Sequence, residues 1–447
     1  MSSGSRSRSV LRRPPSGRSA LIGNRPFRRL WAGSALSMAG TRTLGVCYPL
    51  LAFTLTESPT WTGWVMFAWT LPGLLCFLPA GVLADRVGHQ RVMMWSEAIR
   101  GALVTTLCAG LLLGWLRVDV LLLIAFAEGG LSVVSAIAET ALIPSVATPR
   151  EMNTALAVHE TTVHTVVLAG RPLGGLLFGL WPALPFLANV VFFTLSTSAV
   201  RGVREAGKSL TRPAMRLLPE ICSGIREVRR DPFLWPAMVI TAITNLVFNT
   251  VSMIFISEAT LSGLHPVLFG LILAASGIGG AVGAFISPSR DAISARISEK
   301  TSDRPRMARL TDWIGLTRQG RSMLLVHVWA CAVALTLTFV LALTPLAFAT
   351  AMLLIGLAGG LSNVTIRTMF NRVPVGKTAR VISVFRLGSY GTVALGPLLG
   401  NFLFQNFGTR TALVTLTLSV WASALATTFI PSLRRKLSPL WEVAASR

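Results

Sequence analysis

The sequence predicts an all-α protein that crosses a membrane about twelve times. Of its 447 residues, 52% are hydrophobic and only 13% are charged, about half the charged share of a soluble domain. The mean hydropathy is +0.63. Apolar runs of roughly 20 residues, the length of a helix that spans a bilayer, recur along the whole chain. Helices satisfy their own backbone hydrogen bonds in lipid, so each run is predicted to be helical.

The apolar runs divide into two sets of six. In chain order they cover approximately residues 30–56, 61–83, 92–115, 120–143, 155–180, 184–200, 234–256, 267–286, 323–343, 346–370, 381–404 and 411–430. Between the sixth and seventh runs lies a long polar stretch. It separates two halves of equal span number, which suits a protein built from two similar bundles.

Basic residues gather in every second loop. The segments on one side of the predicted membrane hold nearly all Lys and Arg of the loops, whereas the opposite loops hold only Arg117 and Arg410. The positive-inside rule therefore places both termini in the cytoplasm. This distribution also accounts for the formal net charge of +23, so nucleic acid is not expected as a partner.

Five consecutive regions are predicted. They are a disordered basic cytoplasmic tail (1–26), a six-helix bundle (27–202), a central cytoplasmic loop (203–232), a second six-helix bundle (233–431) and a cytoplasmic tail (432–447). Within the central loop, Ile221, Ile225 and Val228 fall at helical spacing and predict an amphipathic surface helix. A long basic cytoplasmic loop is expected over residues 288–321 of the second bundle.

One tight polar loop, residues 81–93 (GVLADRVGHQRVM), joins the second and third spans. Its first glycine is expected to let two helices approach closely, and its second to permit a backbone turn. The aspartate can accept hydrogen bonds from a helix N-terminus, and the arginines can pair with acids or helix C-termini. Such a cluster can hold one gate of a membrane protein shut. Its members are Gly81, Asp85, Arg86, Gly88 and Arg91.

This loop resembles the signature motif G-x-L-A-D-R-x-G-R-R/K-x of the major facilitator superfamily. It departs from that pattern at His89 and Gln90. Further stretches resemble the bacterial efflux branch that exports drugs, macrolides and siderophores: residues 24–30 (NRPFRRL), 141–144 (ALIP), 270–277 (GLILAASG) and 373–383 (VPVGKTARVIS). The resemblance runs from about residue 24 to 430. It implies two pseudo-symmetric six-helix bundles that rock about a central site.

The fifth span resembles the antiporter motif G-P-x-x-G-G of the same branch, with an arginine in place of the proline. The residues concerned are Gly170, Arg171, Pro172, Gly174 and Gly175. Compared with the branch, intramembrane acids are fewer and intramembrane arginines are more numerous. This difference argues against a simple exchange of cationic drugs for protons.

Polar side chains recur at helical spacing inside four spans. In the fourth span, Glu128, Ser135 and Glu139 share one helix face, because they lie seven and four residues apart. Similar polar faces occur in the first, seventh and tenth spans. Ionisable groups at this depth are costly and usually face a cavity. In the major facilitator fold these four helices line the central cavity.

Two sets of candidate residues follow from these polar faces and from the fifth and eleventh spans. The candidates for proton coupling are Glu128, Glu139, Glu160 and His164. The candidates for a substrate cavity are Thr41, Arg42, Tyr48, Asn245, Asn249, Asn363, Arg386 and Tyr390. The guanidinium groups suit a carboxylate or phenolate.

Structural roles for the same residues stay open. Serines and asparagines can bond across helices, and the arginines can form ion pairs with the acids of the fourth and fifth spans. In the third span, Glu97 and Arg100 are expected to form a local pair near the cytoplasmic end.

These features predict a secondary transporter that exports a small amphipathic, anionic molecule, such as an antibiotic or siderophore, by proton antiport. Two alternatives remain: uptake of a nutrient or lipid by the same fold, and a non-transporting membrane scaffold or sensor. No phosphate-binding loop occurs in the sequence, so ATP is not the expected energy source. An enzyme, a cofactor and a metal site are not expected. We expect a monomer in the cell (inner) membrane, with substrate, protons and lipids as its partners.

Overall fold

The computed structural model describes residues 23–148, 151–203, 217–301, 321–341, 344–370, 373 and 375–429. All regular secondary structure in these ranges is helical. The first half contains α2 (Arg25–Thr56), α3 (Pro59–Thr70), α4 (Pro72–Leu75), α5 (Phe77–Val87), α6 (His89–Leu112), α7 (Val118–Val146), α8 (Met152–Leu180) and α9 (Leu184–Arg201). The second half contains α10 (Leu217–Arg230), α11 (Leu234–Leu261), α12 (Pro266–Thr301), α14 (Arg321–Val340), α15 (Pro345–Phe370) and α16 (Val375–Phe429).

The predicted spans coincide with these helices, and the all-α fold is confirmed. The second span is broken into α3, α4 and α5, and α16 holds the last two spans on either side of Gly408, whose φ is 72°. Among the described residues, seven helices are long and apolar enough to cross a membrane. The bent pair Pro59–Leu75 and Pro79–Val87, with 63° between its parts, gives an eighth.

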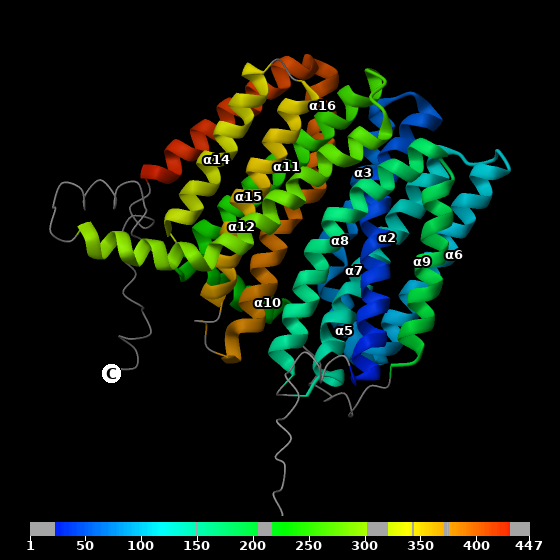
Figure 1. The fold of residues 1–447 in the computed structure, drawn as a ribbon, viewed down its shortest axis with the longest axis horizontal. Helices are drawn as coiled ribbons and strands as arrows, with labels where there is room; N and C mark the ends of the chain where they lie inside the picture. The colour runs from blue at the N-terminus through cyan, green and yellow to red at the C-terminus, as the bar shows by residue number, and fades with distance from the viewer. Residues whose placement is uncertain are drawn as a thin grey trace, which may run out of the picture.

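The helices form two groups that lie side by side (Figure 1). We call α2–α9, coloured blue to green, the N lobe, and α10–α16, coloured green to red, the C lobe. Helix α10 is the surface helix that the spacing of the central loop predicts. The predicted loop at 288–321 begins as a helix instead, because α12 continues to Thr301 and extends away from the bundles (Figure 1). Residues 302–320 lie outside the described part.

The predicted disordered tail also ends earlier than expected. Helix α2 begins at Arg25, within the predicted tail, because the side chain of Asn24 accepts a hydrogen bond from the backbone N–H of Phe27 at 3.0 Å. An asparagine in this position satisfies a backbone donor that the helix itself leaves unpaired. Residues 1–22 and 430–447 lie outside the described part.

Glycines bring α12 and α15 into backbone contact inside the C lobe. A Cβ atom added at Gly279 would lie 2.0 Å from the carbonyl oxygen of Leu353, and one added at Gly356 would lie 2.1 Å from that of Ser276. Both distances are far below van der Waals contact, so only glycine fits. The small residues of these two spans therefore act in close helix packing, as their four-residue spacing indicates.

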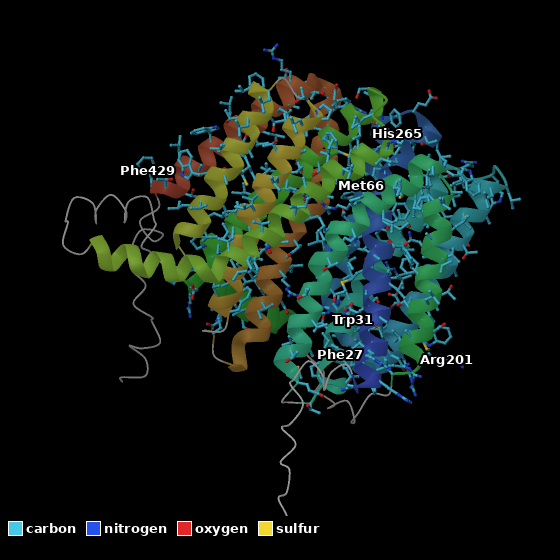
Figure 2. All side chains as sticks on the ribbon, viewed as in Figure 1. Phe27, Trp31, Met66, Arg201, His265 and Phe429 are labelled. Atoms are coloured by element: carbon cyan, nitrogen blue, oxygen red, sulfur yellow. The ribbon has the colours of Figure 1, made fainter. Side chains whose placement is uncertain are left out.

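The two lobes contact each other through α8 with α12, and through α3 with α16. Gly175 of α8 faces Pro266 and Gly270 of α12, and Gly63 of α3 faces Asn401 of α16. These contacts lie in the half of the molecule that contains His265 and Met66, opposite the half that contains Phe27 and Arg201 (Figure 2).

The close approach of α12 and α15 can be tested with a single methyl group. Gly356→Ala is expected to lower the thermal stability and the folded yield of the purified protein, because the new Cβ overlaps a backbone oxygen that cannot move aside. Overpacking of this kind typically costs about 1–3 kcal/mol. Gly130→Ala is the control, since its Cβ would make ordinary contacts at 3.5 Å or more. Equal melting temperatures for the two variants would contradict the packing described.

Candidate functional site

A buried charge cluster lies inside the N lobe, where α2, α6 and α7 meet. Arg100 of α6 donates from Nε and Nη2 to Oε1 of Glu128 at 2.9 and 2.6 Å, and from Nη1 to Oε1 of Glu97 at 3.0 Å. The side chains of all three residues are 1% exposed or less. The attraction between these charges is therefore little screened by solvent, and each charge needs its partner to remain buried.

Neutral side chains complete the hydrogen bonding of the two carboxylates. Ser37 of α2 and Ser135 of α7 donate to Oε1 of Glu97 at 2.8 and 2.5 Å. Trp69 of α3 donates from Nε1 to Oε2 of Glu128 at 2.6 Å. Four helices thus contribute to one network, which fixes their relative rotation.

Arg100 is held from three further directions. Its Nη1 donates to the Ser37 hydroxyl at 2.8 Å and its Nη2 to the Thr41 hydroxyl at 2.6 Å. The guanidinium lies 4.2 Å from the ring centroid of Phe193 on α9, in a cation–π contact. Thr41, predicted to line a substrate cavity, therefore serves as a partner of a buried arginine.

The cluster contains more acid than base. One guanidinium pairs with two carboxylates, so the group carries one excess negative charge when both acids are ionised. Oε2 of Glu97 is buried and has no hydrogen-bond partner among the described residues. A buried carboxylate oxygen without a hydrogen-bond partner carries a desolvation cost. Glu97 is therefore a candidate proton-binding group that the sequence prediction did not include.

Glu139 lies further along the same face of α7. It is buried, and its Oε1 lies 3.3 Å from Nδ1 of His159 on α8. The basic neighbour of Glu139 is thus His159, a residue that the prediction did not name. The side chains of Glu160 and His164 lie outside the described part of the chain.

The predicted polar faces of the first and fourth spans therefore point into the N lobe. Glu128 is partnered by Arg100 rather than by an arginine of the fifth or eleventh span. Glu97 and Arg100 do form the expected i, i+3 pair, but it is buried within the lobe. One signal for this arrangement was present: the third span holds Ser96, Glu97 and Arg100 between apolar stretches.

Tyr48 is also placed in the interior. The side chain is fully buried, and its ring centroid lies 6.1 Å from that of Trp69 and 6.3 Å from that of Phe186. It packs in the core of the N lobe and does not face an open cavity in this conformation.

The loop of the predicted gating motif forms a sharp turn at Gly88. This residue has φ 101° and separates α5 from α6, so the predicted need for glycine is confirmed. The expected close approach at Gly81 is wrong, because a Cβ added there would meet no atom within 4 Å. Arg86 and Arg91 are exposed.

The two positions at which this loop departs from the family pattern make specific contacts. Nε2 of His89, at the start of α6, lies 3.1 Å from Oδ1 of Asp85, near the end of α5. Gln90 donates from Nε2 to the carbonyl oxygen of Val200 at the end of α9, at 3.1 Å. Asp85, His89 and Gln90 thus contact their own lobe.

The glycines of the antiporter-like motif pack α8 against two different helices. A Cβ added at Gly170 would lie 2.7 Å from Cβ of Arg42, and one added at Gly174 would lie 2.8 Å from the carbonyl oxygen of Thr43. Both contacts join α8 to α2. Gly175 instead faces α12 of the C lobe, where a Cβ added at Gly270 would lie 3.2 Å from the Cα of Pro172.

Arg171 makes a direct hydrogen-bonded link between the lobes. Its Nη1 donates to the carbonyl oxygen of Leu273 at 2.6 Å and to the hydroxyl of Ser276 at 2.7 Å, both on α12. The residue that replaces the motif's proline therefore bridges from the N lobe to the C lobe.

Two more arginines lie near this interface. Arg42 is half-buried, and its side chain packs against Gly170, the residue before Arg171. Arg386 is exposed, and its guanidinium lies 6.0 Å from the ring centroid of Phe77 in the opposite lobe. Tyr390 is 58% exposed. These positions place positive charge where the two lobes face each other.

The predicted cavity residues of the C lobe have different roles. Asn249 donates from Nδ2 to the carbonyl oxygen of Asn245 at 2.8 Å and packs against Gly396, so it acts in helix contact. Asn245 and Asn363 instead line a cavity of about 280 Å³ within the C lobe.

Comparison with known proteins agrees with this architecture. Residues 30–311 match the family model of the Major Facilitator Superfamily. Two curated relatives are each 26% identical to the chain. The match to the uncharacterized MFS-type transporter y4rN of Sinorhizobium fredii covers 58% of this chain and 65% of the relative. The match to the uncharacterized MFS-type transporter YceJ of Bacillus subtilis covers 42% of this chain and 49% of the relative. The chain thus spans less than two thirds of either relative.

Solved structures share the fold at low sequence identity. A point mutant of the nucleoside transporter NupG has a TM-score of 0.66 at 11% identity, over 91% of this chain and 100% of that one. A bacterial homologue of the human lysosomal transporter Spinster, in an inward-facing and unoccupied conformation, has a TM-score of 0.64 at 15% identity, over 96% and 100%.

The two helical lobes and the match over residues 30–311 define the class of membrane protein to which the chain belongs. This chain belongs to the Major Facilitator Superfamily.

The charge cluster predicts a specific pattern of stabilities. Arg100→Met is expected to lower the free energy of unfolding by about 3–5 kcal/mol, because it leaves two buried carboxylates without a cation. Adding Glu97→Gln and Glu128→Gln to the same chain is expected to restore most of that loss. Thermal unfolding of the purified variants in detergent measures both effects. A triple variant as unstable as Arg100→Met would contradict the ion-pair description.

Proposed function

We propose that this transporter exports a small amphipathic, anionic molecule, such as an antibiotic or siderophore, in exchange for protons. The main support for an anionic substrate is that Arg42, Arg171 and Arg386 lie near the contact between the lobes. Guanidinium groups bind carboxylates and phenolates through paired hydrogen bonds. An ionisable group in this position within a membrane usually serves substrate or ion passage.

The proposed orientation is that of a multi-pass protein of the cell (inner) membrane with both termini in the cytoplasm. In that orientation, the half of the molecule in which α8 contacts α12 faces outwards. The chain is then inward-facing, and the loop of residues 81–93 lies on the open, cytoplasmic side. Asp85 is expected to exchange its local partner for one in the C lobe when that side closes.

Proton coupling is assigned to the carboxylates of the N lobe. Glu128 and Glu139 remain the proposed carriers, and Glu97 joins them because its Oε2 is unpartnered within the described residues. A carboxylate inside a membrane span is costly and usually serves ion or substrate passage. Protonation removes the excess negative charge beside Arg100 and alters the hydrogen bonds that hold α2, α6 and α7 together. Glu160 and His164 are proposed as a second proton site.

Substrate candidates come from a thermal-shift screen of natural products and siderophores against the purified protein. Everted membrane vesicles then give the direction and the coupling. Substrate that accumulates inside such vesicles is being exported, and loss of accumulation when the pH gradient is collapsed indicates proton antiport. Accumulation that survives this collapse would overturn the antiport proposal, and movement in the opposite direction would favour uptake.

The proton carriers are tested with a double variant. Glu128→Gln with Glu139→Gln is expected to abolish accumulation driven by the pH gradient, because neither amide can take up a proton. Glu258→Gln is the control, since this acid bonds to Thr409 in the C lobe, away from the cluster. Flux at the wild-type rate in the double variant would remove these residues from the mechanism.

The arginines are tested by their effect on substrate affinity. Arg42→Gln and Arg171→Gln are each expected to weaken the binding of an anionic substrate about ten- to hundredfold, the value of one hydrogen bond to a charged group. Arg117→Gln is the control, because Arg117 is exposed and pairs with Asp119 outside the apolar runs. Unchanged affinity in both test variants, measured by titration of the purified protein, would contradict an anionic substrate.

A further inference from the structure

The C lobe contains a cavity with polar and apolar walls, and one of its lining residues, Ser276, also takes part in the contact between the lobes. It has a volume of about 280 Å³ and lies between α11, α12, α14 and α15. This volume is close to the lower limit of small-molecule sites. It suits part of a ligand or a fragment rather than a whole drug-sized molecule.

A buried histidine forms one wall of this cavity. His327 of α14 is 7% exposed, and its Nδ1 has no hydrogen-bond partner among the described residues. An unpaired buried polar atom carries a desolvation cost, which a ligand in the cavity would remove. The sequence alone does not indicate a role for His327, because it is a single histidine in an apolar span.

The glycine opposite the imidazole keeps the cavity open. A Cβ added at Gly359 of α15 would have Nε2 of His327, 4.0 Å away, as its nearest neighbour. By contrast, Cβ atoms added at Gly356 and Gly360 of the same helix would lie 2.1 and 2.2 Å from backbone oxygens of α12. Helix packing therefore explains Gly356 and Gly360 but does not explain Gly359.

The polar atoms of the wall act mainly as acceptors. The hydroxyls of Thr241, Thr244 and Ser276 donate their hydrogens to carbonyl oxygens of their own helices at 2.7, 3.0 and 2.8 Å. Asn245 donates from Nδ2 to the carbonyl oxygen of Ser389 at 2.9 Å. These side chains therefore offer oxygen lone pairs to a ligand. The ligand group that matches them is a hydrogen-bond donor.

Among the described residues that line the cavity, most of the remaining ones are apolar and none is an acid. Phe248, Ile355 and Val364 line the cavity, and none of its lining residues is Asp or Glu. Without a carboxylate, a cationic ammonium group would lack a counter-charge. The donor is therefore neutral, and the apolar wall suits an aliphatic or aromatic body attached to it.

We propose that this cavity is a binding subsite for a neutral hydrogen-bond donor, an amide or alcohol group carried on a small apolar body. The proposal rests on the proposed function, because it assigns the second end of the same substrate: the anionic end faces the arginines and the neutral end enters the C lobe. Asn363, which is exposed, lies at the mouth of the cavity. Ser276 joins the two regions, since it lines the cavity and accepts from Arg171 of the N lobe.

The subsite is tested by fragment binding to the purified full-length protein, which requires no transport. Benzamide and benzyl alcohol are the probes, with toluene and benzoate as fragments that lack a donor or carry a charge. Dissociation constants from saturation-transfer NMR titrations are expected to be at least about tenfold lower for benzamide and benzyl alcohol than for toluene or benzoate. Toluene or benzoate bound as tightly as benzamide would overturn the assignment.

Matched variants locate the bound fragment. Thr244→Val is expected to weaken benzamide about fivefold, the value of one neutral hydrogen bond, whereas Thr338→Val is expected to leave it unchanged. Both threonines are buried and donate to their own helix, but only Thr244 lines the cavity. Gly359→Ala is expected to weaken benzamide at least about tenfold by filling the space before His327, with Gly130→Ala as its control.

The outcome separates this proposal from the proposed function. Benzamide bound equally by wild type, Thr244→Val and Gly359→Ala would overturn the subsite whatever the vesicles transport. Fragment binding that depends on Gly359 would support it even if export against a pH gradient fails.

Discussion

The ion pairs of Arg100 with Glu97 and Glu128 are the interaction on which the N lobe depends. A buried guanidinium fixes the rotation of α2, α6 and α7, because each of these helices supplies a group that it contacts. Neutralising Arg100 alone would leave two buried carboxylates without a compensating positive charge. The same network holds an excess of acid, so the side chains that hold the helices together are also the proposed proton-binding groups. Movement of a proton would then change how the helices are held.

The two lobes differ in how they use polar groups. The N lobe encloses its charges and presents arginines at its surface towards the C lobe. The C lobe has glycine-mediated contacts between α12 and α15, and a neutral polar cavity beside them. Arg171 connects the two systems through Ser276. A substrate with an anionic end and a neutral polar end would contact both lobes at once, which is what alternating access about a central site requires.

Much of the fold could be predicted because it depends on local properties of the chain. Apolar length located the spans, basic loops gave an expected orientation, and the turn at Gly88 followed from its residue type. The site was harder to predict, because periodicity shows which residues share a helix face but not which helix that face meets. The partner of Glu128 was therefore missed, and Tyr48 was assigned to a cavity although it packs in the core. Gly81 was misjudged for the same reason, since a glycine does not reveal whether a neighbour is present.

The central claim is that the cluster around Arg100 takes up a proton. Infrared difference spectroscopy of the protein in lipid, between about pH 5 and pH 9, detects the carbonyl stretch that a carboxyl group shows only when protonated. The account predicts a band from a buried carboxylic acid that diminishes in Glu97→Gln or Glu128→Gln and persists in Glu258→Gln. A spectrum in which neither N-lobe variant changes this band would contradict it.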